Sequence, residues 1–372
     1  MKKKLHYLLV AIIILIFGIT IFTHWSSYTQ PYDPNYWQER YQNSQWVKGW
    51  EAGETMGDPE LYAYAGWRQI QGDDPTEINP EIPPFSRYLF GLSLLIFRNQ
   101  NIQALFFGAG LLMMIYLLSK EIIQDKTWSL LPVVLLSLDK LFLEDLVTSM
   151  LDLPFAFFIS LVFYSLIKAR KNPRWYLGTV ISLALVATTK MYLVGFGLTA
   201  VVGFYLLFLL IVFRYKDFFW FILFSPIFPM IYLATYSVYF LNGHNLIDFK
   251  ELHFWIRHFA RVQMPGYPKF EIWRILLIGQ WHTWFGGELI HLKQWSPLWL
   301  LSFLSLFPTG WLIFKKGIKK NLSLLILIIY PLSLLVMYSY GLPYPRYLLP
   351  VLPPLYILFW YNLKLAWEKW QK

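Results

Sequence analysis

The sequence predicts an all-α polytopic membrane protein, and three observations lead to that fold class. Hydrophobic residues make up 57% of the 372 residues and charged residues only 15%, which is too apolar for an ordinary soluble domain. About ten segments are apolar over the roughly 17 to 25 residues that a helix needs to cross a bilayer. Clusters of Lys and Arg recur between these segments, as is typical of the cytoplasmic ends of membrane helices.

The predicted spans can be placed along the chain by their apolar runs. They lie near residues 5–24, 102–119, 127–143, 150–168, 175–191, 194–213, 217–240, 297–314, 321–340 and 346–363. The first follows three lysines like a signal peptide, but its apolar run is long and no clear small-x-small cleavage site follows. We therefore expect a retained span with a cytoplasmic N-terminus, in a multi-pass protein of the plasma membrane.

Charge supports one orientation of these spans. Counting from the first span places the basic stretches "SKEIIQDK", "KARKNPR", "RYK", "KKGIKK" and "KLAWEKWQK" on the cytoplasmic side, together with the C-terminus. The net charge of +10 is thereby explained without a nucleic-acid partner. Most acidic residues fall at or beyond the opposite face, which suggests that the chemistry takes place outside. The absence of cysteine excludes disulfides and thiolate metal sites.

Two outer segments, residues 25–101 and 241–296, are too long to be simple connections and are the expected location of the function. Both are rich in Trp, Tyr and Phe, which is typical of helices that lie in the headgroup region. We find no internal repeat, low-complexity stretch or flexible linker. The sequence therefore predicts one membrane-embedded domain over residues 1–372.

The first outer segment contains a predicted helix from about residue 59 to 71. Pro59 suits the first helical turn, Glu60 lies where the helix dipole favours negative charge, and Gly72 is a natural terminator. Asp58 could be only the N-cap of this helix. A cap and a catalytic role are compatible, since Asp58 lies just beyond the first span, where it could meet a substrate whose tail is in the bilayer.

Four stretches together resemble a known superfamily. After Asp58 and a nearby Tyr-Ala come "NPEIPPFSRYLFGLSLLIF", "SMLDLPFAFF", "VATTKMYLVGFGL" and "YPRYLLPVLPPL". Their order and their positions at the outer ends of spans resemble the GT-C glycosyltransferases, in particular the protein O-mannosyltransferase and aminoarabinose transferase group (families 39 and 83). The resemblance covers most of the first 200 residues and about the last thirty, and it implies a GT-C bundle.

The resemblance implies a hexosyl or pentosyl transferase that takes a sugar from a polyprenyl phosphate on the outer face. The acceptor would be a protein, a lipid or a glycan. Asp58 matches the first acid of the family's acidic pair and Asp152 matches a later Asp, whereas Pro59 stands where the second acid usually is. Ile82 replaces a common His, and Val147 stands about where an Arg often occurs. The departures leave the acceptor and the finer mechanism open.

The chemistry of sugar transfer also selects residues directly. A carboxylate must take the acceptor proton, and positive charge must stabilise the departing phosphate. Asp58 and Asp152 are the predicted catalytic acids and should face a common cavity. Arg87, Lys190 and Arg346, each at the predicted outer end of a membrane segment, are the predicted donor-phosphate ligands.

Each of these assignments has a structural alternative. Arg87 and Arg346 could extend to lipid headgroups instead. Lys190 follows an uninterrupted apolar span, which favours function. A carboxylate well inside the bilayer costs about 2.5 to 3.5 kcal/mol on insertion scales, so Asp152 either faces a cavity or caps a span that begins later than predicted.

Further acids could assist the site. Glu60 could replace the missing second acid, and Glu81 is a second accessory candidate. With Glu81, the acids Asp73, Asp74 and Glu77 could gather a divalent cation such as Mg²⁺ or Mn²⁺, although "GDDP" is also ordinary turn chemistry. Five histidines of the second outer segment lack a compact zinc spacing and are expected at the interface or the acceptor site: His244, His253, His258, His282 and His291.

Two other classes of function remain open. A lipid or lipid-linked saccharide flippase could use the acidic loop to gate a cavity, although the pseudo-repeated halves or matching broken helices typical of transporters are not found. An inactive scaffold on the same fold would explain the departures at Pro59, Ile82 and Val147.

Overall fold

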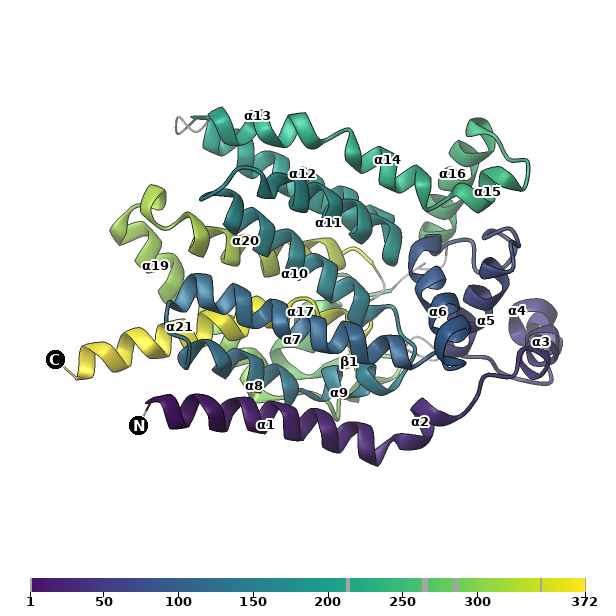
Figure 1. Ribbon diagram of the computed structural model, residues 1–372, viewed down its shortest axis with the longest axis horizontal. Helices are drawn as coiled ribbons and strands as arrows, with labels where there is room; N and C mark the ends of the chain where they lie inside the picture. The colour runs from purple at the N-terminus through teal and green to yellow at the C-terminus, as the bar shows by residue number, and fades with distance from the viewer. Residues whose placement is uncertain (1, 212–214, 263–266, 284–286, 342, 372) are drawn as a thin grey trace.

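The apolar runs of the sequence form the long helices of a bundle in the computed structural model, which describes residues 2–211, 215–262, 267–283, 287–341 and 343–371. Figure 1 shows the long helices running side by side, with both ends of the chain at one end of the bundle. The helices of the first outer segment gather at the other end. This architecture confirms the predicted all-α polytopic fold class.

The bundle is built from long helices completed by shorter ones. The long helices are α1 (Lys2–Thr23), α7 (Ile102–Ile123), α10 (Asp152–Ala169), α11 (Trp175–Thr189), α12 (Tyr192–Ile211), α20 (Leu322–Tyr338) and α21 (Leu352–Trp370). The shorter elements are η2 (Trp128–Leu130), α8 (Leu131–Ser137), α9 (Lys140–Val147), α13 (Tyr215–Phe224), α14 (Ile227–Ala234), α15 (Ser237–Leu241), α18 (Pro297–Leu304), α19 (Leu306–Lys316), η3 (Ile318–Lys320) and η4 (Pro345–Leu348).

Several helical segments of the described chain meet the length and composition needed to cross a membrane. They are Lys3–Thr23, Ile102–Ile123, Asp152–Ala169, Tyr192–Ile211, Tyr215–Ala234 and Pro297–Lys316. Shorter apolar helices accompany them at Pro84–Phe97, Trp128–Ser137, Trp175–Thr189 and Leu322–Tyr338. The chain is therefore an integral membrane protein, although six of its segments rather than ten reach the full spanning length.

Four predicted spans differ in detail from the structure. The span predicted at 127–143 stops at Ser137, because the Asp139 side chain accepts from Leu141 N (2.9 Å) and starts helix α9 there. The span at 217–240 is interrupted before Pro226, whose ring cannot continue a helix, and the span at 297–314 breaks at Ser305. The last predicted span begins late, at Leu352, because η4 precedes it.

The first outer segment contains only short helices. They are α2 (Trp25–Thr29), α3 (Pro34–Gln42), α4 (Gln45–Lys48), η1 (Gly49–Glu51), α5 (Asp58–Ile70) and α6 (Pro84–Phe97). Helix α5 is the helix predicted from about 59 to 71, and Gly72 follows it in the left-handed region with φ +99°. Helices α5 and α6 pack closely at Gly66 and Gly91, where a Cβ on Gly66 would lie 2.9 Å from Gly91 N.

The second outer segment combines two helices with a small hairpin. Helix α16 (Leu246–Val262) is followed by α17 (Glu271–Ile278), and strands β1 (Gln280–His282) and β2 (Leu289–His291) pair antiparallel with Trp281 opposite Ile290. Figure 1 places α15 and α16 at the same end of the bundle as α5 and α6. Helix α16 of the second outer segment therefore lies at the end of the bundle where the first outer segment gathers.

Candidate active site

Asp58 is the first residue of α5, and its carboxylate is directed away from that helix. The N-cap is Gly57, whose backbone N–H donates to Glu60 Oε2 at 2.7 Å. Asp58 Oδ2 instead accepts from Arg346 at 2.7 Å, across 288 residues of sequence. The reading of Asp58 as an N-cap is therefore wrong. Glu60 caps the helix and leaves the carboxylate of Asp58 available for other partners.

A chain of ion pairs links four of the predicted site residues. Arg346 lies between two acids, since its Nε is 3.4 Å from Asp152 Oδ2 while its Nη2 contacts Asp58. Asp152 Oδ1 in turn accepts from Lys190 Nζ at 2.5 Å. The four residues come from α5, α10, the end of α11 and η4. Two carboxylates and two cations thus meet at the end of the bundle that carries α5 and α6.

Exposure differs sharply along this chain. The side chains of Asp152 and Lys190 are only 2% and 4% exposed, whereas that of Asp58 is 33% exposed. Burial lowers the pKa of Arg346, but its electrostatic interactions, chiefly with Asp152, outweigh burial and hold the pKa above its ordinary value. Asp58 is therefore the carboxylate that a second substrate can reach, and Asp152 is enclosed. Arg346 does not extend to lipid headgroups.

Asp152 is the first residue of α10, but it does not cap that helix. The N-cap of α10 is Leu151, and no side chain caps it. The Asp152 carboxylate is bound by Lys190 and Arg346 instead. The alternative reading of Asp152 as a helix cap is therefore wrong.

An aromatic cavity of about 970 Å³ opens beside the ion pairs. Lys190, Tyr344 and Tyr347 belong both to its lining and to the charged site. The Tyr347 ring lies 4.1 Å from Lys190 Nζ, and the Tyr344 ring lies 4.4 Å from the Arg346 guanidinium carbon. Glu81 also lines the cavity, and burial, with the nearby charge of Asp58, raises its pKa. An apolar chain with a negatively charged head would fit such a space.

Arg87 is separate from this site. It is 1% exposed, and its Nη atoms donate to the backbone carbonyls of Pro75, Ile78, Asn79 and Ile82. With the Gln69 amide turned to satisfy its hydrogen bonds, Gln69 also accepts from Arg87 Nε at 3.1 Å. Every N–H of the Arg87 guanidinium thus has a protein acceptor, so the predicted phosphate ligand holds residues 75–82 in place instead.

The acids of the first outer segment turn toward different partners. Asp73 pairs with Arg68, and Glu77 Oε2 lies 3.9 Å from Arg68 Nη2. Asp74 contacts His244 Nε2 at 2.5 Å, and Glu81 accepts from Asn79. Within the described residues, no group of three or more His, Asp or Glu side chains is placed to hold a metal ion.

The histidines of the second outer segment serve as connectors where the structure gives them partners. His244 joins the first outer segment through Asp74 and stacks on Tyr239 at 4.0 Å. His253 Nε2 lies 2.7 Å from Tyr232 Oη, and His282 Nδ1 lies 2.9 Å from the buried Glu271 Oε1. These contacts fix helices α16 and α17 to their surroundings.

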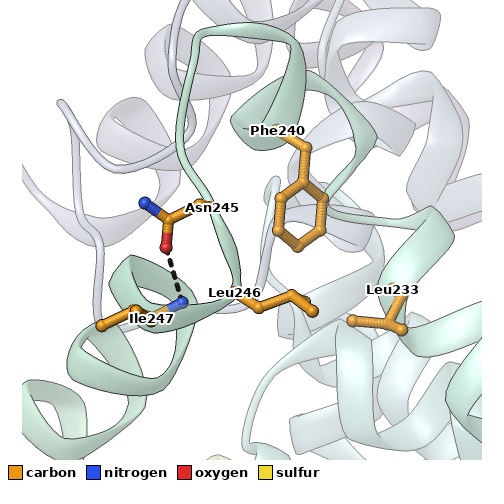
Figure 2. Close-up of a pocket in the computed structure, with 5 residues that line it drawn as sticks. All are labelled: Leu233, Phe240, Asn245, Leu246 and Ile247. Carbon is orange, nitrogen blue, oxygen red and sulfur yellow. Dashed lines mark hydrogen bonds between the residues drawn. The ribbon is translucent and has the colours of Figure 1, made fainter.

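A second pocket, of about 590 Å³, lies where α14, α15 and α16 meet, as Figure 2 shows. Its lining is apolar apart from Asn245, whose Oδ1 accepts from Ile247 N at 2.7 Å. Since that amide oxygen is already engaged and no charged side chain lines the pocket, it supplies no group for the chemistry of transfer.

Comparison with known proteins agrees with this architecture. Residues 80–258 match the family model described as dolichyl-phosphate-mannose-protein mannosyltransferase. No curated protein sequence matches the chain. The matched region begins just before α6 and ends within α16, so it includes Asp152 and Lys190 and excludes Asp58 and Arg346.

Solved structures resemble nearly the whole chain in fold. ArnT from Cupriavidus metallidurans bound to undecaprenyl phosphate has a TM-score of 0.60 and 16% identity, over 96% of this chain and 61% of ArnT. The Archaeoglobus fulgidus oligosaccharyltransferase in the apo form gives 0.59 and 13%, over 98% of this chain and 51% of its own. AglB from the same organism, in complex with an inhibitory peptide and a dolichol-phosphate, gives 0.52 and 14%, over 98% and 51%.

This chain thus spans about 61% of ArnT and about half of the archaeal oligosaccharyltransferase. At these identities the likeness establishes the fold. It confirms the resemblance found in the sequence, because both relatives have the GT-C architecture. The chain is therefore a membrane protein of GT-C fold whose residues 80–258 are similar in sequence to the dolichyl-phosphate-mannose-protein mannosyltransferases.

Proposed function

We propose that the chain is a glycosyltransferase that moves a sugar from a polyprenyl-phosphate-linked donor to a hydroxyl-bearing acceptor on the outer face of the membrane. The observation that carries the proposal is the ion-pair chain from Asp58 to Lys190 beside an aromatic cavity. It joins an exposed carboxylate to two cations at the place where a lipid-linked phosphate could enter. The match of residues 80–258 to the mannosyltransferase model supports the same reaction class.

In the proposed reaction, the acceptor oxygen attacks the anomeric carbon of the donor sugar as the bond from that carbon to the phosphate oxygen breaks. Asp58 takes the acceptor proton, and the bond electrons leave with the polyprenyl phosphate. Arg346 and Lys190 stabilise the charge that builds on the leaving oxygen. Asp152 positions both cations through contacts of 3.4 and 2.5 Å.

Without donor, Asp58 is paired with Arg346, so binding of the donor should also release the Asp58 carboxylate. A phosphate bound to Arg346 competes with Asp58 for the same guanidinium. Displacing Asp58 frees its oxygen to accept a proton, so the donor is expected to bind before the acceptor reacts. Asp58 contacts Arg346 through Nη2 and Asp152 contacts it through Nε, so a phosphate could replace Asp58 without displacing Asp152.

The orientation and the acceptor belong to the same proposal. Both ends of the chain lie at the end of the bundle away from the site, which agrees with cytoplasmic termini and an active site outside the plasma membrane. The acceptor is a protein, a lipid or a glycan that reaches Asp58 from the aqueous side. A flippase or an inactive scaffold on the same fold would bind the lipid phosphate and transfer no sugar.

The decisive test is Asp58→Asn in a transfer assay with a defined polyprenyl phosphate sugar. Asparagine keeps the size of the side chain, and helix α5 keeps its cap at Glu60, but the ability to accept a proton is lost. We expect turnover to fall by at least about 100-fold, within the range that general acid–base catalysis contributes. Normal turnover of Asp58→Asn would show that Asp58 has only a structural role.

Asp33→Asn is the matched control. Asp33 lies in the same outer segment and is exposed, and its side chain caps α3 by accepting from Asn35 N at 3.0 Å. Asparagine is also a good N-cap, so this variant should transfer sugar at the normal rate. If wild-type protein binds the donor lipid but transfers no sugar, the chain is a flippase or an inactive scaffold and not a transferase.

A further inference from the structure

Asp145 occupies a core position of a short helix outside the membrane-spanning segments. Helix α9 buries Leu141, Phe142, Asp145 and Leu146, whereas Glu144 points outward and accepts from Gln294. Three of the four buried positions are therefore apolar and the fourth is an acid. Asp145 is 5% exposed, and carboxyl groups are seldom buried to this extent unless they are paired.

The carboxyl group of Asp145 has an unsatisfied oxygen. Oδ2 is buried and has no hydrogen-bond partner among the described residues. The buried Asp139, six residues earlier, differs, because it accepts from Trp299 Nε1 at 2.8 Å and from Tyr356 Oη at 2.6 Å. The hydrogen bonds of Asp139 therefore explain its burial, whereas no hydrogen bond of the described residues explains the burial of Asp145 Oδ2.

The charges that act on Asp145 belong to the ion-pair site. They come from Asp152 of α10, Lys190 at the end of α11 and Arg346 of η4, with Glu144 as the neighbour on its own helix. On another side, Tyr28 of α2 donates to Leu146 O at 3.0 Å. Burial raises the pKa of Tyr28 to about 12, so this hydroxyl is neutral.

Counting charges shows what Asp145 can change. Asp58 and Asp152 balance Lys190 and Arg346, so the four-residue site is neutral while Asp145 is protonated. Ionisation of Asp145 would give the site a net negative charge before any phosphate arrives. A like charge at a buried site weakens the binding of an anion.

We propose that Asp145 is a third carboxyl group of the site, a positioning residue that must be neutral for a polyprenyl phosphate to bind. The inference rests on the proposed function, which supplies the phosphate. The neutral acid leaves Lys190 and Arg346 free to exchange their carboxylate partners for the phosphate. The ionised acid would compete with that phosphate for the same two cations.

The sign of the pH dependence follows from the environment of the acid. Burial, together with Asp152, raises the pKa of Asp145 well above its ordinary value, although Arg346 and Lys190 act in the opposite direction. The group is neutral below that raised pKa and ionises as the pH rises through it. Affinity for the phosphate should therefore be highest at low pH and fall on the alkaline side.

The test measures the dissociation constant of undecaprenyl phosphate for the purified full-length protein between about pH 6 and 9, a range that covers strongly raised carboxyl pKa values. Wild-type affinity should fall by up to about tenfold for each pH unit above the pKa, the slope of one titrating group. Asp145→Asn keeps the shape of the neutral acid and should remove this fall. Ionisation of the free phosphate is the same for all variants and cancels in the comparison.

Glu144→Gln is the matched control, because it removes a neighbouring charge from the exposed side of the same helix. It should keep the fall in affinity on the alkaline side, because Asp145 still titrates in this variant. Asp145→Leu is a second neutral variant that extends the apolar stripe of Leu141 and Leu146, and it serves if the Asn variant fails to fold. Identical pH profiles for the wild type and a neutral variant would overturn the inference and leave the proposed function standing.

Thermal unfolding supplies a readout that needs no donor. Because the folded-state pKa of Asp145 is raised, wild-type protein loses stability relative to Asp145→Asn as the pH rises from the ordinary Asp pKa through the raised value. A melting-temperature difference that does not change with pH would overturn the neutral state of Asp145. Failure of wild-type protein to bind the phosphate at any pH would instead overturn both proposals.

Discussion

At the scale of single residues, Arg346 is the centre of the site because it contacts both acids, whereas the described contact of Lys190 is with Asp152. Its planar fork reaches Asp58 at 2.7 Å and Asp152 at 3.4 Å. A lysine at this position would keep the charge but present one ammonium group, which cannot reproduce two directed contacts. Arg346→Lys should therefore lower turnover by about 100- to 1,000-fold, the usual effect of removing one donor to a developing anion.

Steady-state rates with a defined polyprenyl phosphate sugar measure this effect. Arg40→Lys is the control, since Arg40 lies in the first outer segment and is 3.6 Å from Glu54, in a partly exposed pair. That variant should retain full turnover, because exposed ion pairs contribute little. Unchanged turnover in Arg346→Lys would remove the bidentate phosphate contact from the mechanism.

Arg87 illustrates what a residue type alone leaves open. Arg87 and Arg346 each lie at the predicted outer end of a membrane segment, and the sequence predicts that both bind phosphate. The structure separates them by their acceptors, which are backbone carbonyls for Arg87 and carboxylates for Arg346. The acceptors of Arg87 depend on how residues 75–82 fold back over its guanidinium group. No local sequence pattern predicts that conformation.

At the scale of helices, the contact between α5 and α6 holds Asp58 in place. A Cβ on Gly66 would lie 2.9 Å from Gly91 N and would also meet the carbonyl oxygen of Arg87. These obstacles are backbone atoms, so the helices must move apart to admit even one methyl group. We expect Gly66→Ala to destabilise the protein by about 1 to 3 kcal/mol, as overpacking usually does.

The same shift should lower transfer, because α5 carries Asp58 at its first residue. Thermal unfolding and transfer rates together measure the effect. Gly203→Ala on α12 is the control, since a Cβ there meets no atom within 4 Å, and alanine is the better helix former. Wild-type behaviour of Gly66→Ala would show that the two helices can separate without cost to the site.

At the scale of the whole molecule, the sequence predicts most helices and misses their interruptions. Long apolar runs such as 102–119 and 150–168 became α7 and α10 because burial in a bilayer favours continuous helices. The span at 127–143 failed because apolar composition does not reveal that Asp139 would bind Trp299 and Tyr356 and begin a new helix. Composition predicts burial, and side-chain partners decide where a helix ends.

The same limit applies to the site, because the sequence predicts the positions of residues but not their side-chain partners. The sequence selects Asp58, Asp152, Lys190 and Arg346 as candidates because each lies at the outer end of a predicted span, so the predicted topology brings them to one face. Their pairing required the packing of four separate elements. Asp145, the residue that we propose to add to the site, is not among the predicted candidates. Its spacing is nevertheless a signal, since an acid between Phe142 and Leu146 is unusual on an apolar helix face.

The orientation of the whole bundle can be tested because the chain contains no cysteine, so a single introduced thiol reports one position. Gly53 of the first outer segment is exposed, and a Cβ there meets no atom within 4 Å. Lys319 is exposed in the basic η3 turn. With the active site outside, Gly53→Cys should react with a membrane-impermeant maleimide in intact cells, whereas Lys319→Cys should react only after permeabilisation. The reverse pattern would place Asp58 and the cavity in the cytoplasm and exclude an acceptor at the outer face. Equal labelling of both variants before permeabilisation would contradict the predicted topology, in which the basic clusters are cytoplasmic and the first outer segment is outside.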